Sequence, residues 1–399
     1  MFAFKTLDDL DVQGRKVLVR ADLNVPMRDG NVSDTTRIDR SLPTLNDLLD
    51  KGAKVIVVSH FGRPKGQAVP EMSMKPVAAA LEMAIGRTVV FGADCVGEAA
   101  RKAIDSTEMG GIVVLENLRF HAGEEKNDDA FADQLAALAD VYVNDAFSCA
   151  HRAHASIEAI AKRLPTAAGR LMQTELDSLS NALEAPTHPV AAVVGGAKIS
   201  TKMAVLGHLI ERVDQLIIGG GMANTFLFAL SFDVGKSLCE QDMAKQAREI
   251  MEKAAAEGCE VVLPVDVVVA DKFVEGASNE TVPVGVVPSD SMILDIGPAS
   301  IDDLKQRLSG CKTVVWNGPL GAFEISPFDL GTNAVARETA RLTEAGQLLS
   351  VAGGGDTVAA LANADAIDRF SYVSTAGGAF LEWLEGRALP GVAALQAAG

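Results

Sequence analysis

The stretch Leu348-Leu-Ser-Val-Ala-Gly-Gly-Gly-Asp-Thr-Val-Ala-Ala-Leu361 combines a strand, a glycine turn and the start of a helix. Leu348–Val351 is a short apolar run typical of a buried strand, and Asp356 or Thr357 can cap the helix that follows. The glycines permit a tight turn, and free amides at the helix start attract phosphate. For this stretch alone, an ordinary capped turn without a ligand remains an alternative. The pattern predicts one strand–helix unit of a parallel sheet.

Similar β-branched runs recur along the chain, each followed by a loop and a segment of helical period. This alternation is typical of βαβ units and a parallel sheet. The expected strands are Lys16–Arg20, Lys54–Ser59, Thr88–Phe91, Ile112–Glu116, Asp140–Val143, Val190–Val194, Gln215–Ile218, Glu260–Leu263, Thr313–Trp316, Leu348–Val351 and Ser371–Ser374. We expect an α/β fold with two doubly wound, Rossmann-like lobes, each with a parallel sheet flanked by helices, joined by an interdomain helix and hinge.

Length and composition agree with two globular domains. A chain of 399 residues exceeds one typical domain, and 48% hydrophobic with 22% charged residues excludes a disordered or fibrous protein. The breaker cluster Leu164-Pro-Thr-Ala-Ala-Gly169 precedes a helix that begins near Leu171. The sequence therefore predicts a domain boundary after residue 168.

Charge and cysteine usage limit the possible partners and location. A net charge of −17 argues against nucleic acid or a membrane surface as a partner, and five scattered cysteines without a C-x-x-C pair suit a reducing cytosol. The start of the sequence lacks signal-peptide character. The uncharged run Gln215–Phe232 contains Gly219–Gly221, which favours a strand, turn and helix over a membrane span. We expect a cytoplasmic protein.

The residues that follow the expected strands differ between the two halves, and ligands bind at the carboxyl ends of parallel strands. In the first half they are Asp22, Asn24, His60, Arg63, Arg119 and His151-Arg152-Ala-His154. In the second half they are Gly195-Gly196-Ala-Lys198, Gly219-Gly220-Gly221, Asn317-Gly318-Pro319, Gly353-Gly354-Gly355-Asp356-Thr357 and Gly377-Gly378. Guanidinium groups bind phosphate and carboxylate, whereas glycines let the backbone approach a ligand. We expect a small polyanion on one lobe and a nucleotide on the other.

Individual charged residues refine this hypothesis. Lys198 and Lys202 stand four residues apart, which predicts that both lie on one face of a helix after a glycine turn. Asp356 adds a carboxylate suited to Mg²⁺ beside phosphate oxygens. Arg37 follows a candidate cap at Ser33-Asp34 and opens an amphipathic helix. A surface ion pair is the alternative for Arg37, and a solvated helical face is the alternative for the lysines.

Other patterns match less well. Gly235-Lys236-Ser237 has Leu230 in place of the leading Walker A glycine, and no G-x-G-x-x-G fingerprint with an acidic partner occurs. His151 and His154 could form a metal pair, but no third ligand has a recognisable spacing. Cys149, close to His151, fits a small buried side chain. A nicotinamide-dependent dehydrogenase and a two-lobed anion-binding protein without chemistry remain the alternative functions.

Taken together, the motifs resemble those of the phosphoglycerate kinase family along essentially the whole chain. The motifs are Val19-Arg-Ala-Asp22-Leu-Asn24-Val-Pro, Ser59-His60-Phe-Gly-Arg63-Pro, Glu116-Asn-Leu-Arg119-Phe, His151-Arg152-Ala-His154, Gly195-Gly-Ala-Lys198, Trp316-Asn317-Gly-Pro, Gly353-Gly-Gly-Asp356-Thr357 and Leu389-Pro-Gly-Val-Ala-Ala-Leu. The resemblance implies reversible phosphoryl transfer between ATP and the carboxylate of 3-phosphoglycerate in glycolysis and gluconeogenesis, by a monomer that uses Mg²⁺.

The resemblance also implies site residues. The implied 3-phosphoglycerate site is Asp22, Leu23, Asn24, Arg37, His60, Phe61, Gly62, Arg63, Arg119 and Arg152. The implied nucleotide site is Lys198, Lys202, Gly219, Gly220, Asn317, Glu324, Gly354, Gly355, Asp356 and Thr357. Within these sets, Gly219 and Gly220 would line the adenine pocket and Glu324 would face the ribose. Arg37, Lys198 and Lys202 would be catalytic, Asp356 would hold Mg²⁺, and a turn at Gly377 and Gly378 would stabilise the transferred group.

The family pattern assigns the end of the sequence to the first lobe. The expected domains are 1–168 with about 386–399 for 3-phosphoglycerate, and 169–385 for the nucleotide. Ala376 and Arg170 depart from the family, which often has glycine and an apolar residue there. Because the acceptor carboxylate, with a pKa of about 3.5, is already ionised, the reaction needs no general base. It needs positioned charges and closure of the lobes by hinge bending.

Overall fold

The computed structural model describes residues 4–398. They form two compact units, which we call the N-terminal unit, up to Asp177 together with the chain from Ala388, and the C-terminal unit, Ser178–Arg387. The chain first passes between them within helix α6 (Arg170–Leu179). The compact units thus divide inside this helix, whereas the sequence analysis placed the boundary before it.

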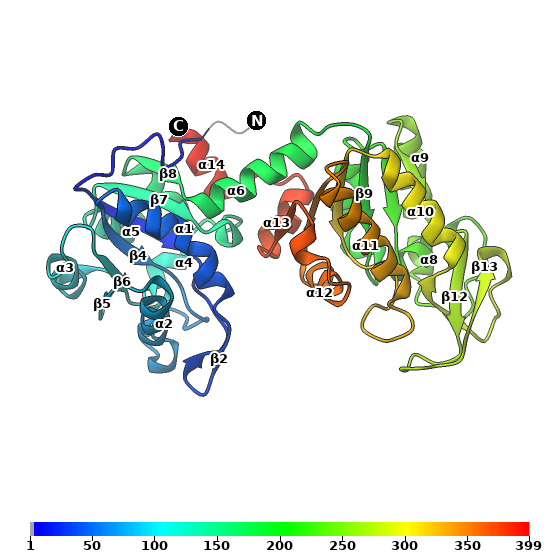
Figure 1. Cartoon of the computed structure of the whole chain (residues 1–399), viewed down its shortest axis with the longest axis horizontal. Coiled ribbons are helices and arrows are strands. Elements are labelled where there is room, and N and C mark those ends of the chain that lie inside the picture. Colours follow the sequence, from blue (N-terminus) through cyan, green and yellow to red (C-terminus); the bar gives the residue numbers. More distant parts are fainter. Residues whose placement is uncertain (1–3, 399) are drawn as a thin grey trace. The chain divides into compact units, whose positions relative to one another are not determined.

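The N-terminal unit is built on a parallel six-stranded sheet in the order β5-β6-β4-β1-β7-β8 (Figure 1). Its strands are β1 (Lys16–Ala21), β4 (Lys54–Val58), β5 (Val89–Gly92), β6 (Ile112–Leu115), β7 (Val141–Asp145) and β8 (Thr166–Ala168). Successive residues alternate between two cores: Val17 and Val19 pack on one face, and Leu18 on the other. Both faces are buried, so the strands are mainly apolar, with charged or polar residues such as Arg20 and Asp145 near their carboxyl ends.

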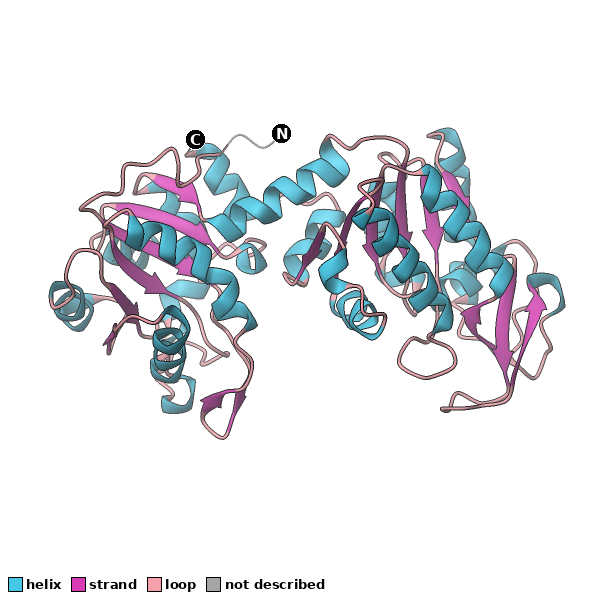
Figure 2. Cartoon of the chain, viewed as in Figure 1, coloured by secondary structure: helices cyan, strands magenta, loops and turns pink. Residues whose placement is uncertain are grey.

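Helices cover both faces of this sheet (Figure 2). The helices of the unit are α1 (Thr36–Asp50), α2 (Lys75–Ile85), α3 (Gly97–Asp105), α4 (Ala122–Glu125), α5 (Asp129–Ala136) and α14 (Pro390–Ala397). The short helical turns are η1 (Pro70–Met72), η2 (Leu118–Phe120), η3 (Phe147–Cys149), η4 (Ala155–Ala159) and η5 (Ile160–Lys162). Helices α1 and α2 supply one core, and α3, α5 and α14 contribute to the other. The final helix is tied to this unit by a hydrogen bond from the Gly391 amide to Ala150 O, 2.9 Å.

The C-terminal unit has its own parallel sheet, in the order β11-β10-β9-β15-β16-β17. Its strands are β9 (Val190–Val194), β10 (Gln215–Ile218), β11 (Glu260–Val262), β15 (Thr313–Asn317), β16 (Leu349–Gly353) and β17 (Tyr372–Ser374). Numbered along the chain, this is the order 3-2-1-4-5-6 of nucleotide-binding doubly wound sheets. The strand order reverses between β9 and β15, where such sheets place their ligand.

Helices again surround the sheet. The helices of this unit are α7 (Met203–Leu209), α8 (Gly220–Ala229), α9 (Ala244–Ala256), α10 (Pro298–Gly310), α11 (Leu330–Glu344), α12 (Gly355–Asn363) and α13 (Gly378–Leu384). The short turns are η6 (Ser180–Glu184), η7 (Ile199–Thr201), η8 (Gln241–Met243), η9 (Val284–Val286) and η10 (Ile367–Arg369). All residues of β9 are buried, so this sheet is also covered on both faces. The predicted α/β class with two doubly wound parallel sheets is confirmed.

Three features of the fold escaped the sequence analysis. The predicted breaker cluster at 164–169 contains strand β8, which pairs with β7 (Thr166 opposite Tyr142), although helix α6 follows it as predicted. An antiparallel sheet, β13-β12-β14, lies in the C-terminal unit, and a hairpin, β2-β3, lies in the N-terminal unit. Their strands are β12 (Asp266–Ala270), β13 (Asn279–Pro283), β14 (Met292–Ile296), β2 (Met27–Arg28) and β3 (Asn31–Val32).

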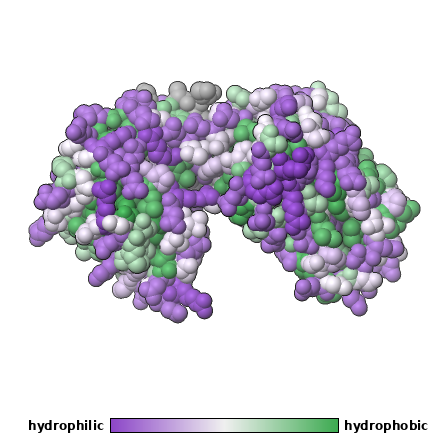
Figure 3. Space-filling model, in the orientation of Figure 1, coloured by the Kyte–Doolittle hydropathy of each residue, from purple (hydrophilic) through white to green (hydrophobic). Residues whose placement is uncertain are grey.

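The surface over the antiparallel sheet carries several exposed apolar residues. Figure 3 shows hydrophobic residues gathered over the part of the C-terminal unit that carries β12 and β13. Exposed residues in and around this sheet include Val265, Phe273, Val274 and Val286. Among residues 4–398, no helix is both long and apolar enough to cross a membrane.

Arg170 opens α6 with ion pairs inside the N-terminal unit. Its Nη2 lies 2.6 Å from Asp8 Oδ1 and its Nε donates to Asp47 Oδ2 at 2.8 Å. The hydrogen bond from Arg170 holds the pKa of Asp8 down at about 2. The arginine, which departs from the usual apolar residue, therefore fastens the first turn of α6 to the start of the chain and to α1.

Candidate active site

The basic residues of the N-terminal unit converge at the carboxyl ends of its strands. Asp22 follows β1, His60 follows β4, Arg119 lies in η2 after β6, and Arg152 follows β7. Burial is the main cause that lowers the pKa of His60, followed by Arg20, Arg119 and Arg152, as expected for side chains that share one region. Parallel strands end at one edge of a sheet, so residues far apart in sequence meet there.

Hydrogen bonds fix several of these residues in place. Asn24 Oδ1 accepts the Gly62 amide at 3.0 Å, and Arg119 Nη1 donates to Gly62 O at 2.7 Å. Asp22 accepts hydrogen bonds from Arg37 and from the Ser148 hydroxyl. This arrangement leaves donors of the arginines available for an anionic ligand.

The remaining predicted site residues of this unit either support the loops or lie nearer the surface. Leu23 is fully buried and its amide donates to Ser59 Oγ at 2.9 Å, and the buried Phe61 donates its amide to Asn117 Oδ1 at 3.1 Å. Both therefore shape the loops that carry the polar groups. Arg63 is exposed, and Arg152 is half-buried. Arg152 Nε donates to His151 Nε2 at 3.1 Å.

A charged residue in the middle of the sheet, Arg20, was missed by the sequence analysis. Arg20 is 1% exposed, donates from Nε to Ser156 Oγ at 2.9 Å, and has Nη2 at 3.1 Å from His60 Nδ1. Burial alone would lower its pKa, but Cys149, Glu124 and other acidic groups raise it overall. Glu124 is itself fully buried and accepts the Ser156 hydroxyl at 2.6 Å. The sequence signal that could have revealed this role is an arginine between apolar residues of a strand. A buried charge without a partner is too costly, so such an arginine implies polar partners nearby.

The imidazoles of His60 and His154 are neutral at pH 7. Burial, followed by Arg20 and Arg119, lowers the pKa of His60 well below its usual value. The same two arginines, after burial, lower the pKa of His154 to about 3. Because a guanidinium can only donate, His60 Nδ1 accepts from Arg20, and its proton stays on Nε2. The positive charge that an anion would meet thus comes from the arginines.

Two residues near His60 also have a metal-ligand arrangement. Asp22, His60 and Cys149 place their ligand atoms within 4.8 Å of one another. Arg20 Nη2 lies 3.7 Å from Cys149 Sγ, and Arg37 pairs with Asp22, so fixed positive charges already occupy the surroundings. This cluster suits an anion rather than a metal ion. Within residues 4–398, His151 and His154 do not belong to a group of three with ligand spacing.

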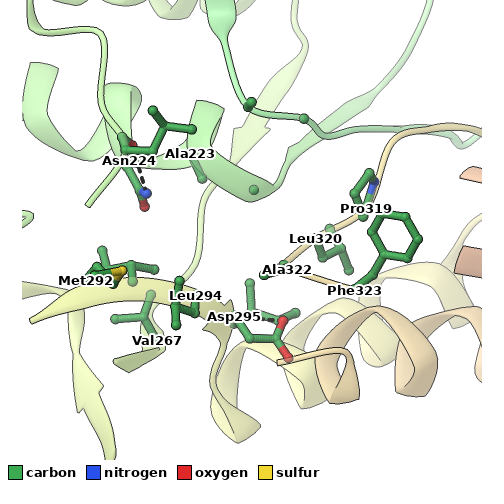
Figure 4. A pocket seen from close by; sticks show the side chains of 18 of the residues that line it. Ala223, Asn224, Val267, Met292, Leu294, Asp295, Pro319, Leu320, Ala322 and Phe323 are labelled. Carbon is green, nitrogen blue, oxygen red and sulfur yellow. Dashed lines mark hydrogen bonds between the residues drawn. The ribbon is translucent and has the colours of Figure 1, made fainter. Parts of the chain in front are cut away.

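The C-terminal unit holds an apolar cavity of about 350 Å³ beside β9 and β15 (Figure 4). Its lining includes Val267 and Phe273 from and after β12, Met292 and Leu294 from β14, and Phe323. The antiparallel sheet that the sequence analysis missed therefore forms one wall. This volume falls in the range of small-molecule sites.

Glycines form the opposite wall of the cavity. Gly220 and Gly221 line it at the start of α8, and the Gly220 amide donates to Leu320 O at 2.9 Å. Gly219 is buried at the helix start, where an added Cβ would collide with Leu320. Glu324 and Asp356 also border the cavity.

A second, polar cavity of about 270 Å³ adjoins the first. Lys198, Lys202, Asn317 and the turn Gly354-Gly355-Asp356-Thr357 line it, and Gly196, Ala197 and Asp356 border both cavities. Helix α12 begins at Gly355, after Gly354 with φ +101°, a conformation that favours glycine. The first amides of α12 and the two lysines place hydrogen-bond donors and positive charge at one cavity, the chemistry that an anion requires.

Contacts within the polar cavity order its side chains. Lys202 Nζ bonds Asn317 Oδ1, and Asn317 Nδ2 donates to Gly353 O at 2.7 Å. Thr357 Oγ1 accepts the Gly318 amide at 2.7 Å. Burial lowers the pKa of Lys202, and Asp356 partly offsets this. These hydrogen bonds join the loop after β15 to the loop after β16. The bond from Lys202 also connects them to the segment after β9, where the strand order reverses.

The expected helical face for the two lysines was wrong. Lys198 has extended backbone angles before η7, and α7 begins only at Met203. The short turn η7 and the extended residue before it carry both ammonium groups to the same cavity by another route. Loop geometry at Gly195-Gly196, not helical spacing, brings them together.

The turn at Gly377 and Gly378 lies at the start of α13. Gly377 has φ +55°, and its carbonyl accepts the Leu381 amide at 3.1 Å. Leu381 lines the polar cavity, so the start of α13 is near the lysines. Ala376, the departure from the family pattern, is buried with its amide on Ser374 Oγ at 3.2 Å.

Comparisons with known proteins agree with this arrangement. The family model described as phosphoglycerate kinase matches residues 7–387. The chain is 64% identical over 395 residues to phosphoglycerate kinase of Rhodospirillum centenum, covering 99% of this chain and 100% of that one, and 61% identical over 393 residues to that of Ruegeria sp., covering 98% and 99%. Its structure is similar to that of phosphoglycerate kinase from Coxiella burnetii, with a TM-score of 0.93, 42% identity, and coverage of 98% and 99%. The dehydrogenase alternative has no support in these matches.

Proposed function

This chain belongs to the phosphoglycerate kinase family, and we propose that its N-terminal unit binds 3-phosphoglycerate while its C-terminal unit binds the nucleotide. Like the family, it is a phosphotransferase that moves a phosphoryl group between ATP and the carboxylate of 3-phosphoglycerate, a step of glycolysis. One observation supports the assignment of a different ligand to each unit. The adjoining apolar and polar cavities fit the two ends of a nucleotide, whereas the arginine cluster of the other unit fits a small polyanion.

The arginine cluster supports the assignment of 3-phosphoglycerate. Arg63, Arg119 and Arg152 supply guanidinium groups that match phosphate and carboxylate oxygens in bidentate fashion. Neutral His60 offers a donor at Nε2, and Asp22 and Asn24 offer acceptors for the substrate hydroxyl. Arg20 and Glu124 form the buried support that holds His60 in the required tautomer.

The two cavities of the C-terminal unit support the nucleotide assignment. The base would enter the apolar cavity between Gly220 and Phe323, with Glu324 near the ribose. The phosphates would lie on Lys198, Lys202 and the first amides of α12. Asp356 borders both cavities. A nucleotide that spans them would therefore lie next to the Asp356 carboxylate.

Asp356 also fits Mg²⁺. Its carboxylate is exposed at the polar cavity, and Mg²⁺ in nucleotide sites commonly takes one or two carboxylates together with phosphate oxygens and waters. When bound, the ion would neutralise phosphate charge and orient the phosphates. The nearby ammonium group of Lys202 would share that charge neutralisation.

Transfer then depends on charge placement rather than on proton removal. The substrate carboxylate is already ionised, so the residues must hold it in line and stabilise the charge on the transferred group. We assign this role to Arg37 from the N-terminal unit and to Lys198, Lys202 and the Gly377-Gly378 turn from the other. Because these groups belong to different units, the reaction requires hinge bending that brings the units together and excludes water. We further propose a cytoplasmic monomer.

Two experiments test the assignment. In a coupled assay, we expect formation of 1,3-bisphosphoglycerate only with ATP, Mg²⁺ and 3-phosphoglycerate together. In calorimetry, Arg152→Ala should lose 3-phosphoglycerate binding at least tenfold and keep ADP binding, and Lys202→Ala should do the reverse. If each variant loses both ligands equally, the division between the units is wrong.

Small-angle scattering tests closure. Each ligand can bind its own unit, but only both together favour the closed state, through their higher affinity for it. The radius of gyration should therefore fall most with 3-phosphoglycerate and a nonhydrolysable Mg-nucleotide present together. An identical radius in the free, singly liganded and doubly liganded protein would exclude hinge bending.

A further inference from the structure

A second cluster of metal-ligating side chains shares no residue with the arginine cluster. Asp94 and Cys95 lie in the turn between β5 and α3, and His121 follows η2 at the end of β6 (Figure 1). The carboxylate, thiol and imidazole place one ligand atom each within 4.8 Å of the others. None of these residues has a part in the phosphoryl transfer described above.

We propose that Asp94, Cys95 and His121 form a binding site for a thiophilic divalent cation of the Zn²⁺ class. A sulfur, a nitrogen and an oxygen ligand are the donor set that Zn²⁺ takes, whereas Mg²⁺ and Ca²⁺ take oxygen ligands. Three protein ligands leave one position for water or a small ligand.

The geometry needs only a small adjustment to hold the ion. Bonds of about 2.0–2.3 Å in a tetrahedral arrangement place ligand atoms roughly 3.3–3.8 Å apart. His121 Nε2 and Asp94 Oδ1 are already 2.7 Å apart in a hydrogen bond, which the ion would replace. Because all three ligand atoms already lie within 4.8 Å of one another, binding needs this pair to separate, and the sulfur to approach, by only roughly 1 Å.

The surroundings hold two of the ligands in position, as ligand-supporting contacts do in metal sites. Asp94 Oδ1 accepts the Cys95 amide at 2.7 Å. The His121 ring stacks on Phe131, with ring centres 5.2 Å apart and planes inclined by 24°. Cys95 is fully buried in the apolar core, while the Asp94 and His121 side chains are 42% and 33% exposed. An ion can therefore enter from solvent past Asp94 and His121 and bind the Cys95 sulfur, which is shielded from water.

The local charge also favours a cation here and not at Cys149. At this site the Asp94 carboxylate is the charged group beside the Cys95 sulfur, with its ligand oxygen within 4.8 Å. Around Cys149, by contrast, Arg20 lies 3.7 Å from the sulfur. A thiolate and a carboxylate at the proposed site would match the two charges of the ion.

Titration with Zn²⁺ alone, in the absence of nucleotide and substrate, tests the proposal. The intact chain should bind Zn²⁺ at this site, and His121→Gln and Asp94→Asn should each weaken that binding at least tenfold. Both side chains are partly exposed, so these variants should fold even where Cys95→Ala does not. Unchanged Zn²⁺ affinity in both variants would overturn the proposal.

Co²⁺ identifies the sulfur. Bound Co²⁺ should give a thiolate-to-cobalt charge-transfer absorption that disappears in Cys95→Ala or, if that variant fails to fold, in His121→Gln. Cys149→Ala is the matched control and should retain it. Loss of the absorption in Cys149→Ala with retention in the His121 variant would assign the metal to the other cluster, and absence of any absorption would exclude a thiolate ligand.

Discussion

Asp145 carries a burial cost that should make its removal stabilising. It ends β7, is 1% exposed, and accepts the amides of Leu171 and Met172 on the same oxygen, Oδ1, at 3.0 and 3.2 Å. Burial raises its pKa from 3.8 to about 7, despite the hydrogen bonds that lower it. An asparagine can keep Oδ1 as the acceptor for both amides, and its Nδ2 can donate to the Thr44 hydroxyl, which hydrogen-bonds the carboxylate in the native chain, so Asp145→Asn removes the charge while keeping these contacts.

The sign follows from proton binding. Between pH 3.8 and about 7, the folded carboxyl holds a proton that the unfolded one has released, so the group lowers stability as pH rises through this window. At 1.36 kcal/mol per pKa unit, the full cost above pH 7 is about 4 kcal/mol, and at pH 5 it is only about 1.6 kcal/mol. Asp145→Asn should therefore gain about 2–3 kcal/mol more at pH 8 than at pH 5.

Urea unfolding at both pH values measures this difference. Both tryptophans of the chain, Trp316 and Trp383, belong to the C-terminal unit, so their fluorescence follows that unit alone. Circular dichroism follows the unfolding of both units. A transition seen by circular dichroism but not by fluorescence is therefore the unfolding of the N-terminal unit, which contains Asp145. Asp105→Asn, an exposed change in the same unit, is the control and should have little effect at either pH. An equal gain at pH 5 and pH 8, or a loss at both, would refute the reasoning.

Three further changes test the site and the unit that carries Arg170. Arg37→Ala should lower kcat at least 100-fold with little change in thermal stability, because a positioned charge in the transition state contributes about 3–4 kcal/mol; more than half the activity remaining would remove Arg37 from catalysis. Asp356→Asn should weaken use of the Mg-nucleotide much more than 3-phosphoglycerate binding, as measured by separate titrations of the two ligands, and equal losses would contradict the assigned metal role. Arg170→Leu should lower the unfolding midpoint of the N-terminal unit at pH 7 and low salt, since it breaks the pairs with Asp8 and Asp47. With the Asp8 pKa held at about 2, that contribution should persist at pH 5 and disappear as pH falls toward 2; a midpoint difference that does not change between pH 7 and pH 2 would show that the ion pair is not its cause.

The structure explains why some sequence predictions succeeded. Val190–Val194 and Gln215–Ile218 were placed with their observed bounds because buried parallel strands are continuous apolar runs that glycine loops end. The helix after Arg37 was predicted from its apolar period, and Ile38, Leu45 and Leu49 are indeed buried along it. Some residues of the proposed site, such as His60 and Arg119, were named because they follow such strands, whereas the roles of others, such as Arg37 and Glu324, came from the family resemblance.

Other features depend on contacts that local sequence does not encode. Strand β8 is only Thr166–Ala168, too short for periodicity, and it exists because β7 offers an open edge. Lys198 and Lys202 line the same cavity, as predicted, but loop geometry places them there and not a shared helical face. Strands β12 to β14 had too little alternation to stand out, yet they wall the apolar cavity.

The amino-acid sequence by itself determined the α/β class, the basic character of one set of strand ends and the glycine-rich character of the other. These properties follow from residue type and short-range periodicity. Only the tertiary structure decided that Arg20 supports His60, that β9 and β15 flank the reversal of strand order, and that Asp94, Cys95 and His121 meet. Each of these depends on which distant segments pair, and pairing is set by burial of whole sheet faces rather than by any one stretch of the chain.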